Sequence, residues 1–322
     1  MHSSTYNPNY DIVICVGPQH IEIAQVVINQ VNRLFQAQTI YVITNDTNFK
    51  YFESLGQTID LVPINENELF DKFNFQSVSH FLISKLNNSD RTGWYFQQFL
   101  KMEIAKIIKS DYYLIWDADT IPLKPISFFD KEGKVLIHKS EENHAPYFET
   151  LQNVLDIAKS VNYSFISEHF MVQTTLMRQM LFDLSKNASE RPWPYYILDN
   201  IAIKDMALSG FSEYETYGNF LNSTNPDSFR LRTATGELLN TSRNGSMLFG
   251  TLPNTKDLKF LEVLGLHYVT FEIWQDINLK EIKNNKKRTK LFFLLEKIPL
   301  IKLLNKLIAK KIKKTYSLPP QP

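Results

Sequence analysis

The sequence has only one cysteine, Cys15, among 322 residues. A single thiol excludes an intramolecular disulfide and any metal site built from several cysteines. It favours a protein of a reducing compartment, although a small apolar position in a strand would hold such a residue equally well.

Long apolar runs and glycine-rich nucleotide loops are also missing. Residues 1–10 are polar and the apolar run at 12–16 is short, so we expect no secretory signal. No stretch has the eighteen or more apolar residues of a membrane-spanning helix. No Gly-x-Gly-x-x-Gly turn follows the first expected strand, and no Walker-type loop occurs, which argues against dinucleotide and P-loop sites.

The charge is distributed unevenly although the formal net charge is only +1. Residues 281–314 hold 12 basic and 2 acidic residues, whereas the rest holds 23 basic and 32 acidic residues. After Pro299 the apolar residues follow helical spacing and the lysines lie off that stripe. We expect residues 281–322 to be a basic amphipathic tail that binds an anionic inner-membrane surface. The alternative is a terminal helix that packs on the rest with a solvated lysine face; nucleic acid is not an expected partner.

Strand-like and helical patterns alternate in the first half. Apolar runs predict strands at 11–17, 39–44, 59–64 and 112–116, and helical spacing predicts helices at 21–34 and 94–108, with loop and short helix at 65–93. The second half is less regular, with strands expected at 134–138 and 165–172 and helices at 151–159, 176–184 and 197–208. This order predicts an α/β sheet whose ligands bind at the carboxyl ends of the strands.

The strongest motif is Asp117-Ala118-Asp119, which follows the expected strand at 112–116. Two carboxylates separated by one small residue can both approach a divalent ion, and Mg²⁺ or Mn²⁺ prefers oxygen ligands and readily bridges to diphosphate. Ala118 would let a sugar or ribose pass close to the backbone. The alternative is an Asx-type turn with no ligand.

The segment YYLIWDADTIPLKP, residues 112–125, resembles the metal-binding segment of GT-A glycosyltransferases, and the wider pattern is similar to bacterial polysaccharide and lipopolysaccharide glycosyltransferases. WYFQQFLK at 94–101, FSEYETYG at 211–218 and the late His267 contribute to this resemblance. It implies a GT-A, Rossmann-like fold with a mixed central sheet over residues 1–280. Residues 10–130 would bind the nucleotide-sugar and residues 131–280 the acceptor.

The resemblance also implies roles for single residues. Asp117, Asp119 and His267 would hold the metal, with His267 alternatively a core or surface histidine. The donor would be bordered by residues at the strand ends and on the helix at 94–108, namely Val16, Gly17, Asn45, Gln98, Lys101, Trp116, Asp117 and Ala118. Gln98 and Lys101 share a helix face, from which Lys101 either reaches the diphosphate or faces solvent.

Glu213 and Glu215 are candidates for the general base of an inverting transferase, with Asp199 as a third. Both glutamates lie among tyrosines before a glycine, a composition that suits a sugar-binding wall. They would share one face if the segment were a strand. The alternative is a segment with solvated acids.

We therefore expect a metal-dependent transferase that moves a sugar from a nucleotide-sugar to a bacterial surface glycan or lipid-linked glycan. It would lie in the cytoplasm, peripheral on the inner face of the cell membrane. The alternatives are a nucleotidyltransferase, or another metal-dependent nucleotide enzyme, on a related sheet, and a non-catalytic membrane-associated module.

Overall fold

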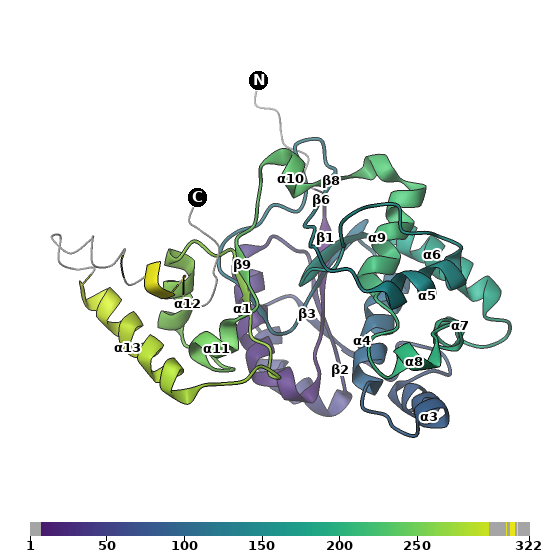
Figure 1. Ribbon diagram of the computed structural model, residues 1–322, viewed down its shortest axis with the longest axis horizontal. Helices are drawn as coiled ribbons and strands as arrows, with labels where there is room; N and C mark the ends of the chain where they lie inside the picture. Colours follow the sequence, from purple (N-terminus) through teal and green to yellow (C-terminus); the bar gives the residue numbers. More distant parts are fainter. Residues whose placement is uncertain (1–7, 296–306, 308–309, 313, 315–322) are drawn as a thin grey trace. The chain divides into compact units, whose positions relative to one another are not determined.

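The structure is a computed structural model that describes residues 8–295, 307, 310–312 and 314 (Figure 1). Unit 1 comprises Met1–Pro18, Ala37–Asp117 and Ser127–Glu237, and unit 2 comprises Gln19–Gln36, Ala118–Ile126 and Leu238–Pro322. Most of the expected amphipathic tail after Pro299 lies outside the described residues.

Unit 1 is built on a five-stranded sheet with strand order β3-β2-β1-β4-β7. The first four strands are parallel and β7 runs antiparallel to β4, so the predicted mixed central sheet is confirmed. The strands are β1 (Tyr10–Cys15), β2 (Ile40–Thr44), β3 (Leu61–Asn65), β4 (Tyr112–Trp116) and β7 (His169–Gln173).

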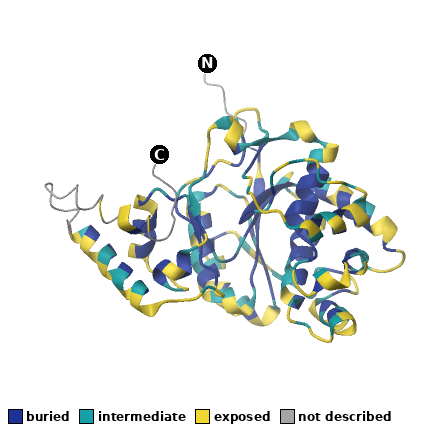
Figure 2. Cartoon of the chain, in the orientation of Figure 1, coloured by how far each residue is buried: buried dark blue, intermediate teal, exposed yellow. Residues whose placement is uncertain are grey.

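Burial on both faces explains the apolar composition of the central strands. All six residues of β1 are buried, and Ile12 lies opposite Ile40 of β2 and Leu114 of β4 (Figure 2). Cys15, at the end of β1, is a buried free thiol, and burial raises its pKa to about 12. The thiol is therefore protonated at neutral pH and behaves as a small core residue.

Helices α4, α6 and α9 of unit 1 pack against one another and lie on one side of its sheet (Figure 1). A small parallel pair, β6 (Val135–Ile137) with β8 (Phe229–Leu231), completes the unit. The helices are α2 (Glu53–Gly56), α3 (Phe75–Leu86), α4 (Thr92–Glu103), α5 (Ala145–Leu155), α6 (Thr174–Asn187), α7 (Trp193–Asp199), α8 (Ile203–Met206), α9 (Glu213–Thr224) and α10 (Arg232–Thr235).

Unit 2 combines helices with a three-stranded sheet of order β5-β10-β9. Helix α1 (Ile21–Leu34) spans the predicted residues and buries the apolar face that its spacing indicated. The other elements are β5 (Thr120–Pro122), β9 (Thr241–Ser242), β10 (Tyr268–Thr270), α11 (Gly245–Phe249), α12 (Thr255–Val263) and α13 (Leu279–Leu295). None of the described helices has the length and apolar character needed to cross a membrane.

The single helix predicted at 197–208 is wrong. Helix α7 ends at Asp199, Asn200 leaves the helical conformation, and Ala202 is extended before the short helix α8 begins. Asp199 therefore lies at the end of a helix and not near its start.

Two capping signals in the sequence mark helices that the apolar spacing did not predict. Asn74 accepts a hydrogen bond from the Ser77 backbone N–H and begins the twelve-residue helix α3, within the region expected to hold loop and short helix. Ser212 accepts from the Glu215 backbone N–H and begins α9. Such side-chain caps satisfy backbone donors that have no partner within the helix.

Candidate functional site

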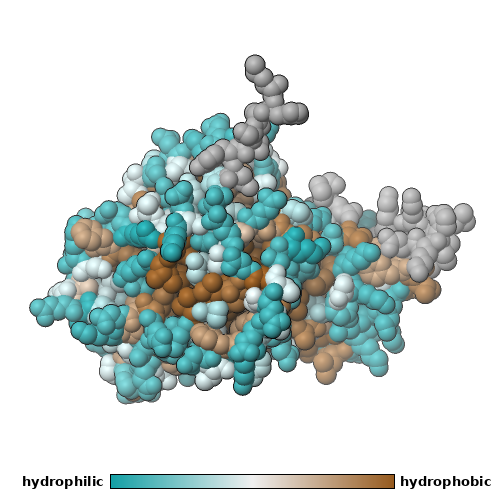
Figure 3. Space-filling model, turned by 180° about the vertical axis from the view of Figure 1, so that it is seen from behind, coloured by the Kyte–Doolittle hydropathy of each residue, from teal (hydrophilic) through white to brown (hydrophobic). Residues whose placement is uncertain are grey.

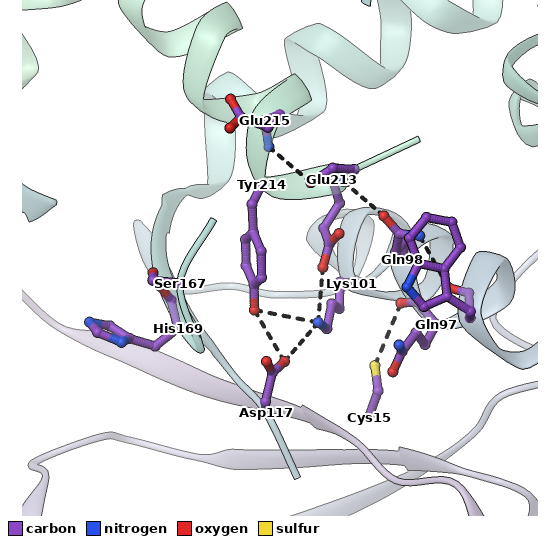
Figure 4. A network of polar contacts seen from close by, with 12 residues as sticks. Cys15, Gln97, Gln98, Lys101, Asp117, Ser167, His169, Glu213, Tyr214 and Glu215 are labelled. Carbon is purple, nitrogen blue, oxygen red and sulfur yellow. Dashed lines mark hydrogen bonds and ion pairs between the residues drawn. The ribbon is translucent and has the colours of Figure 1, made fainter. Parts of the chain in front are cut away.

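Asp117 directly follows β4, and its side chain is held by two groups of unit 1. Its Oδ1 accepts hydrogen bonds from Lys101 Nζ at 2.8 Å and from the Tyr214 hydroxyl at 3.2 Å (Figure 4). No described residue forms a hydrogen bond or ion pair with Oδ2, and 29% of the side-chain surface is exposed. One carboxylate oxygen is therefore fixed in place while the other remains open to a ligand.

Lys101 lies between two carboxylates. Its ammonium donates to Asp117 Oδ1 and to Glu213 Oε1, at 2.8 and 2.9 Å, and only 6% of its side chain is exposed. Burial by itself would lower the pKa of Lys101, but the two carboxylates outweigh burial and hold the pKa well above its usual value. Lys101 is thus a buried cation at neutral pH, and the formal charges of Lys101, Asp117 and Glu213 sum to −1.

Tyr214 contributes a buried hydroxyl that sequence reasoning did not single out. Burial first, and then the charge of Asp117, raise the pKa of Tyr214 well above its usual value, so the phenol stays protonated and donates to Asp117. Its ring lies 4.8 Å from Lys101 Nζ and stacks on Phe170 with centroids 6.0 Å apart. The Ser212 and Glu215 spacing is a helix-start signature and was the signal that could have placed Tyr214 in a first helical turn.

Gln98 fixes the start of α9 and is not open to a donor molecule. Its Oε1 accepts the Glu213 backbone N–H at 3.1 Å, and its amide nitrogen donates to the Trp94 carbonyl at 3.2 Å. The predicted shared face of Gln98 and Lys101 therefore points into unit 1, toward Glu213.

Glu215 points away from Asp117, although only Tyr214 separates it from Glu213 (Figure 4). Successive residues of an α-helix turn by about 100°, so residues two apart lie on different faces. The Glu215 carboxylate accepts from the Ser164 hydroxyl at 2.5 Å and from the Asn219 amide at 3.1 Å, and burial raises its pKa. It stabilises the packing of α9 and is placed poorly for a general base.

Asp199 is the third candidate base and lies at the surface. It forms an ion pair with Arg191, and its side chain is 35% exposed. Of the three predicted bases, the structure brings only Glu213 close to Asp117, because Lys101 donates a hydrogen bond to both carboxylates.

A second polar feature of unit 1 is a pocket of about 500 Å³ beyond the ends of β2 and β3. Asn45, which was predicted to border the donor, lines it; burial raises the pKa of Glu66 there, against the effect of its hydrogen bond with Asn45. Sequence reasoning missed most of the lining, which is rich in amides and includes one exposed aromatic ring: Pro18, Thr47, Asn48, Glu66, Asn67, Asn74, Phe75 and Gln76.

Other predicted donor residues lie in or near the core. Val16 is buried, and its carbonyl accepts the Thr44 hydroxyl. Trp116 is fully buried with its ring 5.1 Å from that of His169, so its side chain is closed to ligands. Gly17 is half-buried next to the pocket residue Pro18, and Ala118, in unit 2, is buried.

The two remaining metal candidates, Asp119 and His267, belong to unit 2 and lie at opposite ends of one strand pair. The His267 carbonyl accepts from Leu123, whereas the Asp119 carbonyl accepts from Phe271. Four extended residues separate these positions by about 13 Å. His267 Nδ1 instead accepts the Asn240 backbone N–H at 2.9 Å. His267 therefore lies away from Asp119, with Nδ1 already hydrogen-bonded, and is not a ligand of the proposed metal site.

Within the described residues, no three His, Cys, Asp or Glu side chains come close enough together to hold a metal ion. Mg²⁺ in nucleotide enzymes is usually held by one or two carboxylates together with substrate phosphates. The open oxygen of Asp117 at a strand end fits one such carboxylate.

Three solved structures with low similarity to this chain are those of glycosyltransferases. Mouse xyloside xylosyltransferase 1 shares 12% identity over 69% of this chain and 84% of its own, with a TM-score of 0.36. The glycosyltransferase GlyE of Streptococcus pneumoniae shares 11% identity over 98% of this chain and 66% of its own, with a TM-score of 0.41. The galactosyltransferase LgtC, solved with donor and acceptor sugar analogs, shares 12% identity over 87% of this chain and 95% of its own, with a TM-score of 0.44.

No curated protein matches the sequence. The family described as "Family of unknown function (DUF6492)" matches residues 20–241. Because this match covers more than half of the 322 residues, the chain belongs to that family.

Proposed function

We propose that this protein is a metal-dependent glycosyltransferase that takes a sugar from a nucleotide-sugar donor. The observation that carries this proposal is the Asp117 carboxylate beyond β4, with one oxygen held by Lys101 and Tyr214 and the other open. The formal charge of −1 on Lys101, Asp117 and Glu213 together favours a bound cation.

Asp117 and Asp119 are the proposed ligands of Mn²⁺ or Mg²⁺. The part played by Asp119 rests on the Asp-x-Asp motif in the sequence. When bound, the ion would neutralise the charge that develops on the diphosphate as it leaves the sugar. Lys101 and Tyr214 act on Asp117 itself: their hydrogen bonds fix the orientation of the carboxylate before a ligand arrives.

The pocket beyond β2 and β3 is the proposed site for the nucleoside of the donor. Its amides can donate to and accept from a base edge, and the Phe75 ring offers a stacking surface. Glu66 can accept hydrogen bonds from a base amine or a ribose hydroxyl. This assignment retains the predicted roles of Asn45 and Gly17.

Glu213 is the general base that we propose if transfer inverts the anomeric configuration. Its Oε1 is engaged with Lys101, and Gln98 holds its backbone. An acceptor hydroxyl would have to come within hydrogen-bond reach of the second oxygen, Oε2, or lie one water away.

The acceptor that we propose is a bacterial surface glycan or a lipid-linked glycan, reached from the cytoplasmic face of the membrane. This part of the proposal rests on the resemblance of the sequence and on the basic character of residues 281–314. A nucleotidyltransferase is the alternative, and the two differ in the product that they release.

The test is to incubate the purified protein with a panel of nucleotide-sugars and Mn²⁺ and to identify the released product. Free nucleoside diphosphate, formed with Mn²⁺ and lost in EDTA, is the expected result. Pyrophosphate as the product from a nucleoside triphosphate and a sugar phosphate would support the nucleotidyltransferase instead. If neither product forms with any donor in the panel, the proposal is wrong.

A further inference from the structure

Helix α13 is docked on unit 2 by one face. Ile282, Asn285, Thr289 and Phe292 are buried at helical spacing, and α13 packs against α11 and α12. The Asn285 amide donates to the Leu248 carbonyl at 3.2 Å. Part of the basic segment is therefore a folded element with a fixed orientation on its unit.

The exposed side chains on the opposite face of α13 are lysines and leucines. At about 100° per residue, one arc of the helix collects the exposed lysines and leucines. The lysines are Lys280, Lys283, Lys287 and Lys290, and the leucines are Leu279, Leu291 and Leu294. Among the described residues, no acidic side chain pairs with any of these four lysines.

The segment that leads into α13 adds exposed apolar side chains. Trp274 is 76% exposed, and Ile273 and Ile277 are also exposed. Figure 3 shows that apolar surface and hydrophilic side chains lie side by side on the face of the molecule that it draws. Asp276 is an exposed acid in the same segment, and its negative charge offsets part of the positive charge of the neighbouring lysines. We call this segment and the outer arc of α13 together the basic-apolar face.

We infer that the basic-apolar face binds an anionic phospholipid surface. Lysines that surround leucines and an exposed tryptophan suit the membrane interface, where the ammonium groups meet lipid phosphates and the apolar groups enter the acyl boundary. A nucleic acid would use the lysines but leave Trp274 and the leucines without partners. This inference extends the proposed membrane partner and does not depend on sugar transfer.

The first test is co-sedimentation of the full-length protein with vesicles at low salt. Vesicles of equal parts phosphatidylcholine and phosphatidylglycerol should bind it, vesicles of phosphatidylcholine alone should bind it at least tenfold more weakly, and about 0.5 M NaCl should weaken binding through screening. The variant with Lys280→Gln, Lys283→Gln, Lys287→Gln and Lys290→Gln should lose at least tenfold in partition coefficient.

A matched variant controls for the removal of four charges. Lys72, Lys109, Lys131 and Lys204 are exposed lysines of unit 1, and changing each of them to Gln should leave the partition coefficient within twofold of wild type. Equal loss in both variants would show that net charge alone attracts the protein. Unchanged binding of the α13 variant would show that other basic residues suffice, and either result overturns the inference.

The second test asks whether the apolar groups enter the lipid. Trp274 is the only strongly exposed tryptophan among the described residues, so the wild-type emission should shift to shorter wavelength with anionic vesicles. Trp274→Phe should still bind but lose the shift, Trp274→Ser should bind several-fold more weakly, and Asp276→Asn should bind more tightly. Binding without any shift would overturn the insertion of Trp274.

Two further outcomes would assign the face to another partner. Tighter binding of a single-stranded RNA oligonucleotide than of anionic vesicles, lost in the α13 variant, would assign it to nucleic acid. A concentration-dependent dimer in light scattering that the Trp274→Ser change abolishes would assign it to a second copy of the chain. Release of nucleoside diphosphate from a soluble donor should be unaffected by all of these variants, which separates this inference from the proposed function.

Discussion

Two places at the strand ends of the unit 1 sheet differ in the number of charged side chains that they contain. Beyond β4, a buried lysine lies between two carboxylates and a tyrosine. Beyond β2 and β3, the pocket is lined mainly by uncharged amides, one aromatic ring and one carboxylate. The charged place suits the proposed metal-diphosphate group, and the uncharged lining suits the proposed nucleoside.

Loss of the cation beyond β4 should have the largest effect on stability. Lys101→Met leaves Asp117 and Glu213 close together without their shared cation, and breaking a buried ion pair from one side typically costs about 3–5 kcal/mol. Urea unfolding measures this loss. Lys204→Met, at an exposed lysine 4.0 Å from Asp205, is the control and should cost less than about 1 kcal/mol. Equal losses of unfolding free energy in the two variants would show that the buried contacts of Lys101 stabilise the unit no more than an exposed ion pair does.

Loss of one metal ligand should have the largest effect on catalysis. Asp117→Asn and Asp119→Asn each remove an anionic oxygen while keeping the volume, and kcat should fall at least about a hundredfold with the fold intact. Steady-state kinetics with Mn²⁺ and circular dichroism check the two parts. Full activity in EDTA would contradict the metal-dependent mechanism.

The two glutamates of the first turn of α9 should differ in their effect on catalysis. Glu213→Gln should lower kcat by about 10² or more if Glu213 is the base, with donor affinity nearly unchanged. Glu215→Gln and Asp199→Asn should retain near-normal kcat because their carboxylates are engaged elsewhere. Normal kcat in all three variants would favour a retaining mechanism, and the anomeric configuration of the product, measured by NMR, would decide.

A substitution in the pocket beyond β2 and β3 should change the KM for the donor and leave the kcat of the chemical step unchanged. Phe75→Ala removes the proposed stacking surface, and base stacking on an aromatic ring contributes about 1–3 kcal/mol. We expect the donor KM to rise about tenfold with kcat within twofold of wild type. Ile83→Ala, at an exposed position of the same helix α3, is the control. A fall in kcat at constant KM would contradict the nucleoside assignment.

The smallest expected effect is a pH dependence of stability at Glu215. Burial raises the pKa of Glu215 above its usual value, so the folded protein binds the proton more tightly than the unfolded chain. The contribution of this group to stability therefore grows as the pH falls through the raised pKa and is complete below the unfolded value of about 4.5. The difference in unfolding free energy between wild type and Glu215→Gln should change in this direction between neutral and mildly acidic pH, and a constant difference would contradict it.

Much of the fold could be predicted because several elements of the two units have strong local patterns. The runs at 39–44 and 112–116 and the helical spacing at 21–34 match β2, β4 and α1. The break between α7 and α8 could not be predicted from apolar spacing, which continues through both helices. Helix α9 was missed, and the short helix expected within residues 65–93 was given no bounds, because the capping residues Ser212 and Asn74 were not used as start signals.

The candidate site could be predicted in part. Asp117, Lys101 and Glu213 were all candidates, but their contacts depend on tertiary packing, since Lys101 and Glu213 are 112 positions apart. No local pattern shows that a helix lysine will be buried between two acids. The same limit applies to Glu215 and Trp116, whose types suit a binding site but whose side chains are buried in contacts of the fold.

The most direct test of the metal-diphosphate site is calorimetric binding of nucleoside diphosphates to the full-length protein. One member of a panel of uridine, guanosine, cytidine, adenosine and thymidine diphosphates should bind with Mn²⁺ present, and its affinity should fall at least about a hundredfold, near 3 kcal/mol, in EDTA and in Asp117→Asn. Binding of that diphosphate with equal affinity in EDTA and in Asp117→Asn, or no binding of any member, would contradict the account.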